Sequence, residues 1–127
     1  MPDTAPKPAL KQDQAELVVL ALLRDEPKYG YAISREVQAR SDGAFRLTPG
    51  ALYPLLTRLE KQGFVLTQWE EVKAQGAEPD AGGRRRKWYR LSAKGTRRLD
   101  QRIEAHRTFT RLIDGFIEGP APRGATA

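Results

Sequence analysis

The sequence predicts a mainly α-helical fold with one small β-hairpin, a winged helix-turn-helix followed by a C-terminal dimerisation helix. Three successive segments before residue 63 carry apolar residues at helical spacing. Two strand-like segments, residues 65–71 and 85–91, flank a glycine-rich polar loop, and a last apolar stripe of helical period follows them. The 127 residues suffice for one domain. We expect a flexible arm over residues 1–12, the winged helix over 13–91, the dimerisation helix over 92–118 and a disordered tail over 119–127.

Charge and composition narrow the classes of partner. The chain has 22 lysines and arginines against 16 acidic residues, a net charge of +6, which favours polyanions such as nucleic acid, although an anionic membrane surface would also fit. Eleven of the 22 basic residues fall within residues 84–111, where only two acidic residues occur. The absence of cysteine excludes disulfides and thiolate sites. Because no apolar run approaches the roughly 20 residues of a membrane span and the start lacks a signal-peptide core, we expect a cytoplasmic protein without membrane contact.

The first two helices are expected over residues 14–23 and after the Tyr-Gly-Tyr triplet at 29–31. The first is dense in leucine and valine, which suits a helix buried on most sides, and Pro27 closes it off. In the second, Ile33 and Val37 lie four residues apart with polar residues between them, and the Ser-Asp-Gly sequence at 41–43 ends it.

The third helix has a clear start and end. Thr48 is a candidate hydroxyl N-cap, Pro49 suits the first helical position, and Gly63 lies where a C-terminal cap belongs. Four leucines follow the spacing of one buried face: Leu52, Leu55, Leu56 and Leu59. Three short helices that lead into a strand have the order of a winged helix.

The opposite face of this third helix is a candidate DNA-contact surface. It carries neither large apolar nor acidic side chains; its members are Gly50, Pro54, Thr57 and Lys61, flanked by Tyr53 and Arg58. Gly50 and Ala51 would let the helix N-terminus approach a phosphate closely, where N–H groups and the helix dipole favour anions. An ordinary solvated face explains the same residues equally well. Pro54 removes a helical hydrogen bond at about 3 kcal/mol, and we hypothesise that it bends the first turn for entry into a groove.

The hairpin supplies a second basic element. Four cations follow Gly82-Gly83 directly: Arg84, Arg85, Arg86 and Lys87. Alternation along a strand divides them between two faces, so at least two should meet a DNA backbone. The alternative is that they are edge charges that discourage aggregation. We expect Trp69 and Trp88 to serve hairpin packing, and the loop over residues 72–83 to be a mobile wing tip.

The C-terminal helix, capped by Ser92 and running to about residue 117, carries the predicted dimer interface. Its apolar stripe comprises Leu99, Ile103, His106, Phe109, Leu112, Ile113 and Phe116, widened by Ile117. A second apolar stripe on an already closed domain favours packing against another chain. Packing back onto the first helix is the alternative, and both can occur in a dimer. For His106, the only histidine, a satisfied interface hydrogen bond is favoured over a pH or ligand contact.

Three motifs together resemble the PadR family of bacterial transcriptional regulators: YGYAISREV, LTPGALYPLLTRLEKQGFV and GRRRKWYRLSAKG, within residues 17–95. The resemblance implies a homodimeric winged-helix repressor that binds an inverted repeat and is released by a small molecule, expected between the dimerisation helices. Tyr29, Gly30 and Tyr31 match the start of the family's second helix, which places both tyrosines among the expected DNA contacts. The recognition-helix motif is matched by Gly50, Leu52, Tyr53 and Pro54, and the wing strand by Arg85, Lys87 and Tyr89. Trp88 departs from the family's usual tyrosine, and the loop before Arg85 is longer than usual.

The function predicted is therefore sequence-specific binding of double-stranded DNA in transcription regulation, without a cofactor or a metal. A winged-helix module that binds another protein is the alternative, although four consecutive cations argue against it. An enzyme is excluded because there is no cysteine, paired carboxylates or phosphate-cradling loop, and the one histidine lies on an apolar stripe.

Overall fold

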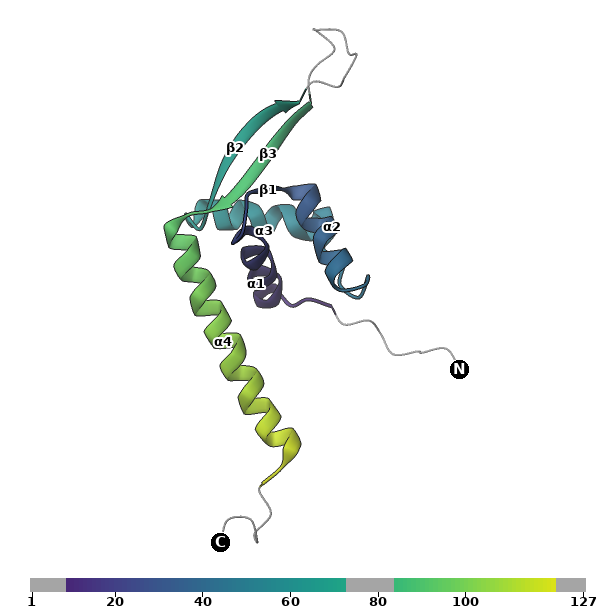
Figure 1. Ribbon diagram of the computed structural model, residues 1–127, viewed down its shortest axis with the longest axis vertical. Helices are drawn as coiled ribbons and strands as arrows, with labels where there is room; N and C mark the ends of the chain where they lie inside the picture. Colours follow the sequence, from purple (N-terminus) through teal and green to yellow (C-terminus); the bar gives the residue numbers. More distant parts are fainter. Residues whose placement is uncertain (1–8, 73–83, 121–127) are drawn as a thin grey trace, which may run out of the picture.

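The computed structural model describes residues 9–72 and 84–120, which form helices and a small antiparallel sheet. In chain order the elements are α1 (Gln12–Leu23), β1 (Lys28–Tyr29), α2 (Gly30–Arg40), α3 (Pro49–Lys61), β2 (Val65–Val72), β3 (Arg84–Leu91) and α4 (Ala93–Glu118). The sheet has the order β1-β3-β2, and its hairpin extends beyond the three short helices (Figure 1). This is the predicted fold class. The wing tip and most of the predicted arm and tail lie outside the described residues.

The elements match the expected ones in type and order except at β1, although α2 begins at Gly30, inside the triplet after which it was expected. Helix α1 begins two residues earlier than predicted, at Gln12, and each hairpin strand is one residue longer than predicted. Strand β1 was not predicted. It consists only of Lys28 and Tyr29, which pair with Tyr89 and Trp88 of β3. Two residues are too few for an alternating pattern, so only pairing to a distant strand makes this segment extended.

Helix α3 begins at Pro49 and ends before Gly63, as predicted, and its four leucines are buried. Gly63 has a φ of 79°, the left-handed conformation that glycine adopts readily after a helix. The predicted hydroxyl cap is wrong. Thr48 occupies the cap position, but its side chain makes no capping hydrogen bond; its carbonyl oxygen instead accepts from the N–H groups of Ala51 and Leu52 at 3.0 and 2.8 Å.

Among the residues that the structure describes, the core contains one charged side chain, Glu16 of α1, which is only 2% exposed. Two arginines of α4 enclose its carboxylate: Arg98 Nη2 lies 3.4 Å from Oε1, and the Arg102 guanidinium donates to Oε2. Leu99, between these arginines in sequence, is 1% exposed and belongs to the same core. The first part of α4 is therefore fastened to α1 by a buried ion cluster and by apolar packing.

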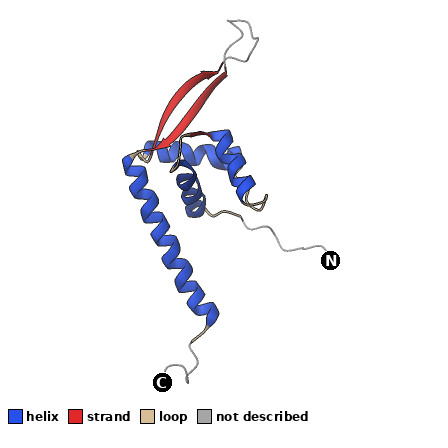
Figure 2. Ribbon diagram, viewed as in Figure 1, coloured by secondary structure: helices blue, strands red, loops and turns tan. Residues whose placement is uncertain are grey.

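The junction between β3 and α4 is tightly packed against the end of α3. The Ser92 hydroxyl accepts from the Gly95 N–H at 2.9 Å and donates to the Gly63 carbonyl oxygen at 2.5 Å. A Cβ at Gly95 would lie 1.9 Å from the backbone oxygen of Phe64, which only glycine avoids. This junction sets the direction of α4, whose far half runs past α1 and away from the sheet (Figure 2).

Candidate nucleic-acid interface and dimer surface

A groove of about 690 Å³ lies between α3, the start of α2 and the inner face of the hairpin, and we call it the wing groove. Its wall contains five aromatic side chains, three cations and two small residues. They are Tyr29, Gly30, Tyr31, Tyr53, Thr57, Trp69, Arg85, Arg86, Lys87 and Tyr89. Seven of the residues predicted to contact DNA therefore meet here, from four different elements: Tyr29, Tyr31, Tyr53, Thr57, Arg85, Arg86 and Lys87.

The glycine of the Tyr-Gly-Tyr triplet makes room for the recognition-helix tyrosine. A Cβ at Gly30 would lie 2.8 Å from the Tyr53 hydroxyl oxygen, so the phenol ring packs directly on the start of α2. Tyr53 remains 45% exposed and Tyr31, next to the same glycine, is 61% exposed. The triplet and the α3 motif are thus parts of one surface.

The groove's cations pack on aromatic rings. The Arg85 guanidinium carbon lies 4.7 Å from the centroid of the Trp69 ring, and that of Arg86 lies 4.9 Å from the Tyr29 ring. Both arginines are exposed at the surface. Stacking restricts each guanidinium while leaving its N–H groups available to an anion such as phosphate.

Lys87 differs from the two arginines because it has a carboxylate partner. Its Nζ lies 3.1 Å from Oε1 of Glu60 in α3, whose other oxygen accepts a 2.6 Å hydrogen bond from the Thr67 hydroxyl. These bonds, that of Thr67 above all, hold the pKa of the Glu60 carboxyl below its ordinary value of 4.5. Burial raises the pKa of the neighbouring Tyr89 phenol. Glu60 thus ties the wing to α3 and offsets part of the Lys87 charge.

The outer face of α3 is exposed as predicted. Thr48, Gly50, Ala51, Pro54 and Lys61 are exposed, and Arg58 is half-buried. On the flank away from the wing, a second groove of about 730 Å³ is lined in part by Pro54, Arg58 and Arg46. Cations therefore border the exposed face of α3 on both sides. The side chain of Arg84, also predicted to contact DNA, lies outside the described part of the chain.

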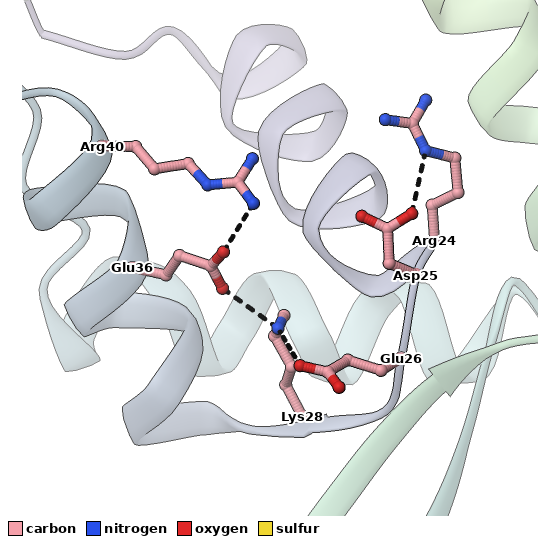
Figure 3. A network of polar contacts seen from close by, with 6 residues as sticks. All are labelled: Arg24, Asp25, Glu26, Lys28, Glu36 and Arg40. Atoms are coloured by element: carbon pink, nitrogen blue, oxygen red, sulfur yellow. Dashed lines mark hydrogen bonds and ion pairs between the residues drawn. The ribbon is translucent and has the colours of Figure 1, made fainter.

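A network of ion pairs steadies the segment that presents Tyr29 and Tyr31. Lys28 Nζ lies 3.1 Å from both Glu26 and Glu36, and Arg40 joins Glu36 at 2.7 Å (Figure 3). Burial, the largest influence, acts to lower the pKa of Lys28, but the bonds and charges of the two glutamates together outweigh it and raise the pKa. The network fixes β1 against α2.

The predicted dimer stripe divides into two parts. Leu99 lies in the chain's own core and Ile103 is half-buried against it, so the assignment of Leu99 to an interface is wrong: the domain needs it to close the core over α1. His106 is exposed. Beyond it, five large apolar side chains are exposed by 42–86%: Phe109, Leu112, Ile113, Phe116 and Ile117. The surface that a second chain could cover is the far half of α4.

Three residues of the groove were not among the predicted DNA contacts, namely Gly30, Trp69 and Tyr89, and we expected another role for Trp69. We expected Trp69 and Trp88 to serve hairpin packing. Trp69 does carry Arg85 and Lys87 of β3 over its ring, but it is still 52% exposed, whereas Trp88 is half-buried. The register that sets Trp69 opposite Lys87 would have shown that both lie on one face. A long intervening loop hides this register in the sequence.

Comparison with known proteins decides the family. Residues 19–101 match the profile of the transcriptional regulator PadR-like family. The chain belongs to this family. A protein X of Lysinibacillus sphaericus, of uncharacterised function, is 30% identical to this PadR-like chain over 102 residues, which cover 80% of the chain and 86% of the relative. The transcriptional regulator YqjI of Escherichia coli is 26% identical over 93 residues, which cover 72% of the chain but only 44% of YqjI.

Solved structures of proteins with similar sequences have the same fold. The protein smu.1704 of Streptococcus mutans has a TM-score of 0.72 and 28% identity, covering 91% of this chain and 97% of its own. A PadR family transcriptional regulator of Eggerthella lenta has a TM-score of 0.66 and 26% identity, covering 84% and 83%. The family confirms the predicted class, a transcriptional regulator rather than an enzyme. Among the described residues, no helix is long and apolar enough to span a membrane. No group of three or more His, Cys, Asp or Glu side chains in this part of the chain could hold a metal ion.

Proposed function

We propose that this PadR-like regulator binds DNA as a homodimer, with α3 in the major groove and the adjacent sugar–phosphate strand in the wing groove. The observation that carries the proposal is the meeting of the wing cations and the exposed face of α3 in one groove. That face offers small residues near the N-terminus of α3, which permit close approach, and Tyr53, Thr57 and Lys61 as donors to phosphates or base edges.

The electrostatics support a phosphate partner. With a net charge of +6 per chain and exposed Arg85 and Arg86 at the groove, binding should release counterions and weaken steeply with salt. Arg46 and Arg58 on the far flank of α3 give a second place for phosphates to contact the protein. Cations on both flanks suit a helix inserted between two backbone strands.

The homodimer is proposed from the far half of α4. Five exposed apolar side chains on one helix favour burial against a second copy, and a two-fold axis makes such a contact self-complementary. Two α3 helices related by that axis would enter successive major grooves about 34 Å apart, which requires an inverted-repeat operator.

We further propose that the regulator represses transcription and is released by a small molecule held between α4 helices. In the single chain a hollow of about 280 Å³ already lies between α1 and α4, and Leu17, His106 and Phe109 contribute to its lining. A partner helix packed on Phe109 would close over this hollow. An occupant there would change the angle of α4 and hence the spacing of the two α3 helices.

A mobility-shift titration with DNA from upstream of the protein's own gene, at two salt concentrations and with random duplex as competitor, tests this function. Tight, salt-sensitive binding that survives the competitor supports a sequence-specific regulator. Binding that the competitor abolishes contradicts operator recognition and favours the module that binds another protein.

A further inference from the structure

Trp69 is a large apolar residue of the hairpin that stays about half exposed although two side chains of β3 stack on its ring. It lies on β2 opposite Lys87, on the same face of the hairpin as Thr67, and it is 52% exposed. Because side chains alternate along a strand, this is the face that closes the wing groove over α3.

The other tryptophan shows what a packing role looks like in this hairpin. Trp88 is half-buried, meets the Tyr29 ring edge-on with centroids 5.3 Å apart, and donates its indole N–H to Glu70. Trp69 instead keeps about half of its surface in solvent. Exposure of an indole is unfavourable unless a partner covers it.

The surroundings of Trp69 indicate the chemistry of that partner. The Arg85 guanidinium lies 4.7 Å and the Lys87 ammonium 5.6 Å from the centroid of the indole ring. Both cations lie over the ring, so the part of the indole that remains exposed is an apolar plate bordered by two positive charges. A partner that fits must alternate anionic and apolar groups within a few ångströms.

A sugar–phosphate strand has this alternation, since each phosphate is followed by a deoxyribose with an apolar C–H face. Bases are stacked inside a duplex and do not offer their faces to the plate. We propose that Trp69 is a DNA-contact residue that packs against a deoxyribose of the strand in the wing groove, while Arg85 holds the adjoining phosphate. This inference rests on the proposed DNA-binding function and adds to it an apolar contact that is independent of sequence.

Because the contact is independent of sequence, random duplex DNA at low salt tests it without knowledge of the operator. Binding of a labelled duplex is followed by fluorescence anisotropy over a series of salt concentrations. We expect Trp69→Ala to weaken binding roughly tenfold at every salt concentration, a change of about 1.4 kcal/mol, and to leave the salt slope unchanged since no charge is removed.

Leu66→Ala is the matched control, because Leu66 is another exposed apolar residue of β2, 41% exposed, but on the opposite face of the hairpin. It should bind as the wild type does. A flattened salt slope in Trp69→Ala would assign the loss to the neighbouring cations and overturn the contact. Equal losses in the two variants would overturn it as well.

Acrylamide quenching of tryptophan fluorescence measures the burial directly. In Trp88→Phe, where only Trp69 emits, DNA should reduce quenching severalfold; in Trp69→Phe, where only Trp88 emits, DNA should change it little. Should Trp88→Phe fail to fold, the wild type compared with Trp69→Phe gives the same difference. Bound duplex with Trp69 still fully quenched overturns this inference and leaves the proposed function standing. No binding of any duplex by the wild type at low salt overturns both.

Discussion

Phe116→Ser tests whether α4 is the dimer interface without disturbing the fold of the single chain. Phe116 is 86% exposed, so the domain loses almost no internal contact when its ring is removed. Phenylalanine and serine also have similar helix propensities, so α4 itself should persist. Any change in self-association then comes from the surface of the helix.

The magnitude follows from burial. Transfer of an exposed apolar side chain into an interface contributes about 2 kcal/mol, and with 86% of Phe116 exposed nearly all of it is available. Because Phe116 occurs once in each chain of a two-fold interface, the substitution should weaken the free energy of dimerisation by about 4 kcal/mol. This corresponds to a dissociation constant roughly 1,000-fold higher.

Sedimentation velocity over a wide range of protein concentration gives that constant. Arg107→Ser is the matched control, because residues nine apart lie on opposite sides of a helix and Arg107 is also exposed. Wild-type protein and the control should dimerise alike, with Phe116→Ser monomeric at concentrations where they are dimers. Unchanged self-association of Phe116→Ser, with native circular dichroism, would refute the assignment of the interface to α4.

Three further predictions concern stability. Gly95→Ala should destabilise the fold by about 2 kcal/mol in urea, because its methyl group meets a backbone oxygen, whereas Gly115→Ala in open space on the same helix should be neutral or stabilising. Glu16→Gln should lower the free energy of unfolding by about 3 kcal/mol, since two arginines lose their buried carboxylate, and Asp13→Asn on the exposed face of α1 should not. The pKa of Glu60 is lowered in the folded state, so its ionised carboxylate stabilises the fold. This contribution is fully present at pH values above the ordinary pKa of 4.5 and is lost as the pH falls through the folded pKa. Glu60→Gln should thus be less stable than wild type at neutral pH by less than about 1 kcal/mol, given its partial exposure, and the difference should shrink as the pH falls below the folded pKa; a constant difference would contradict the assigned cause.

The long, strongly periodic elements could be predicted from sequence because their signals are local. The four leucines of α3, with Pro49 before them and Gly63 after them, give both the helix and its buried face. The basic run at the start of β3 and the apolar stripe of α4 are likewise local patterns, from which we predict a nucleic-acid partner and a second chain. A period and a capping residue are properties of neighbours along the chain, so no tertiary structure is needed to recognise them.

Tertiary structure decided what depends on distant partners. Strand β1 exists because Lys28 and Tyr29 pair with β3, and Leu99 is core because α4 packs on α1, where two arginines of α4 pair with Glu16. The pairing register between β2 and β3 sets Trp69 beside Arg85 and Lys87. The length of the loop between these strands does not reveal that register from the sequence. Local periodicity thus determined the helices and their apolar faces, whereas the packing of elements far apart in the chain decided which apolar residues are buried within the chain and which outward residues share one groove.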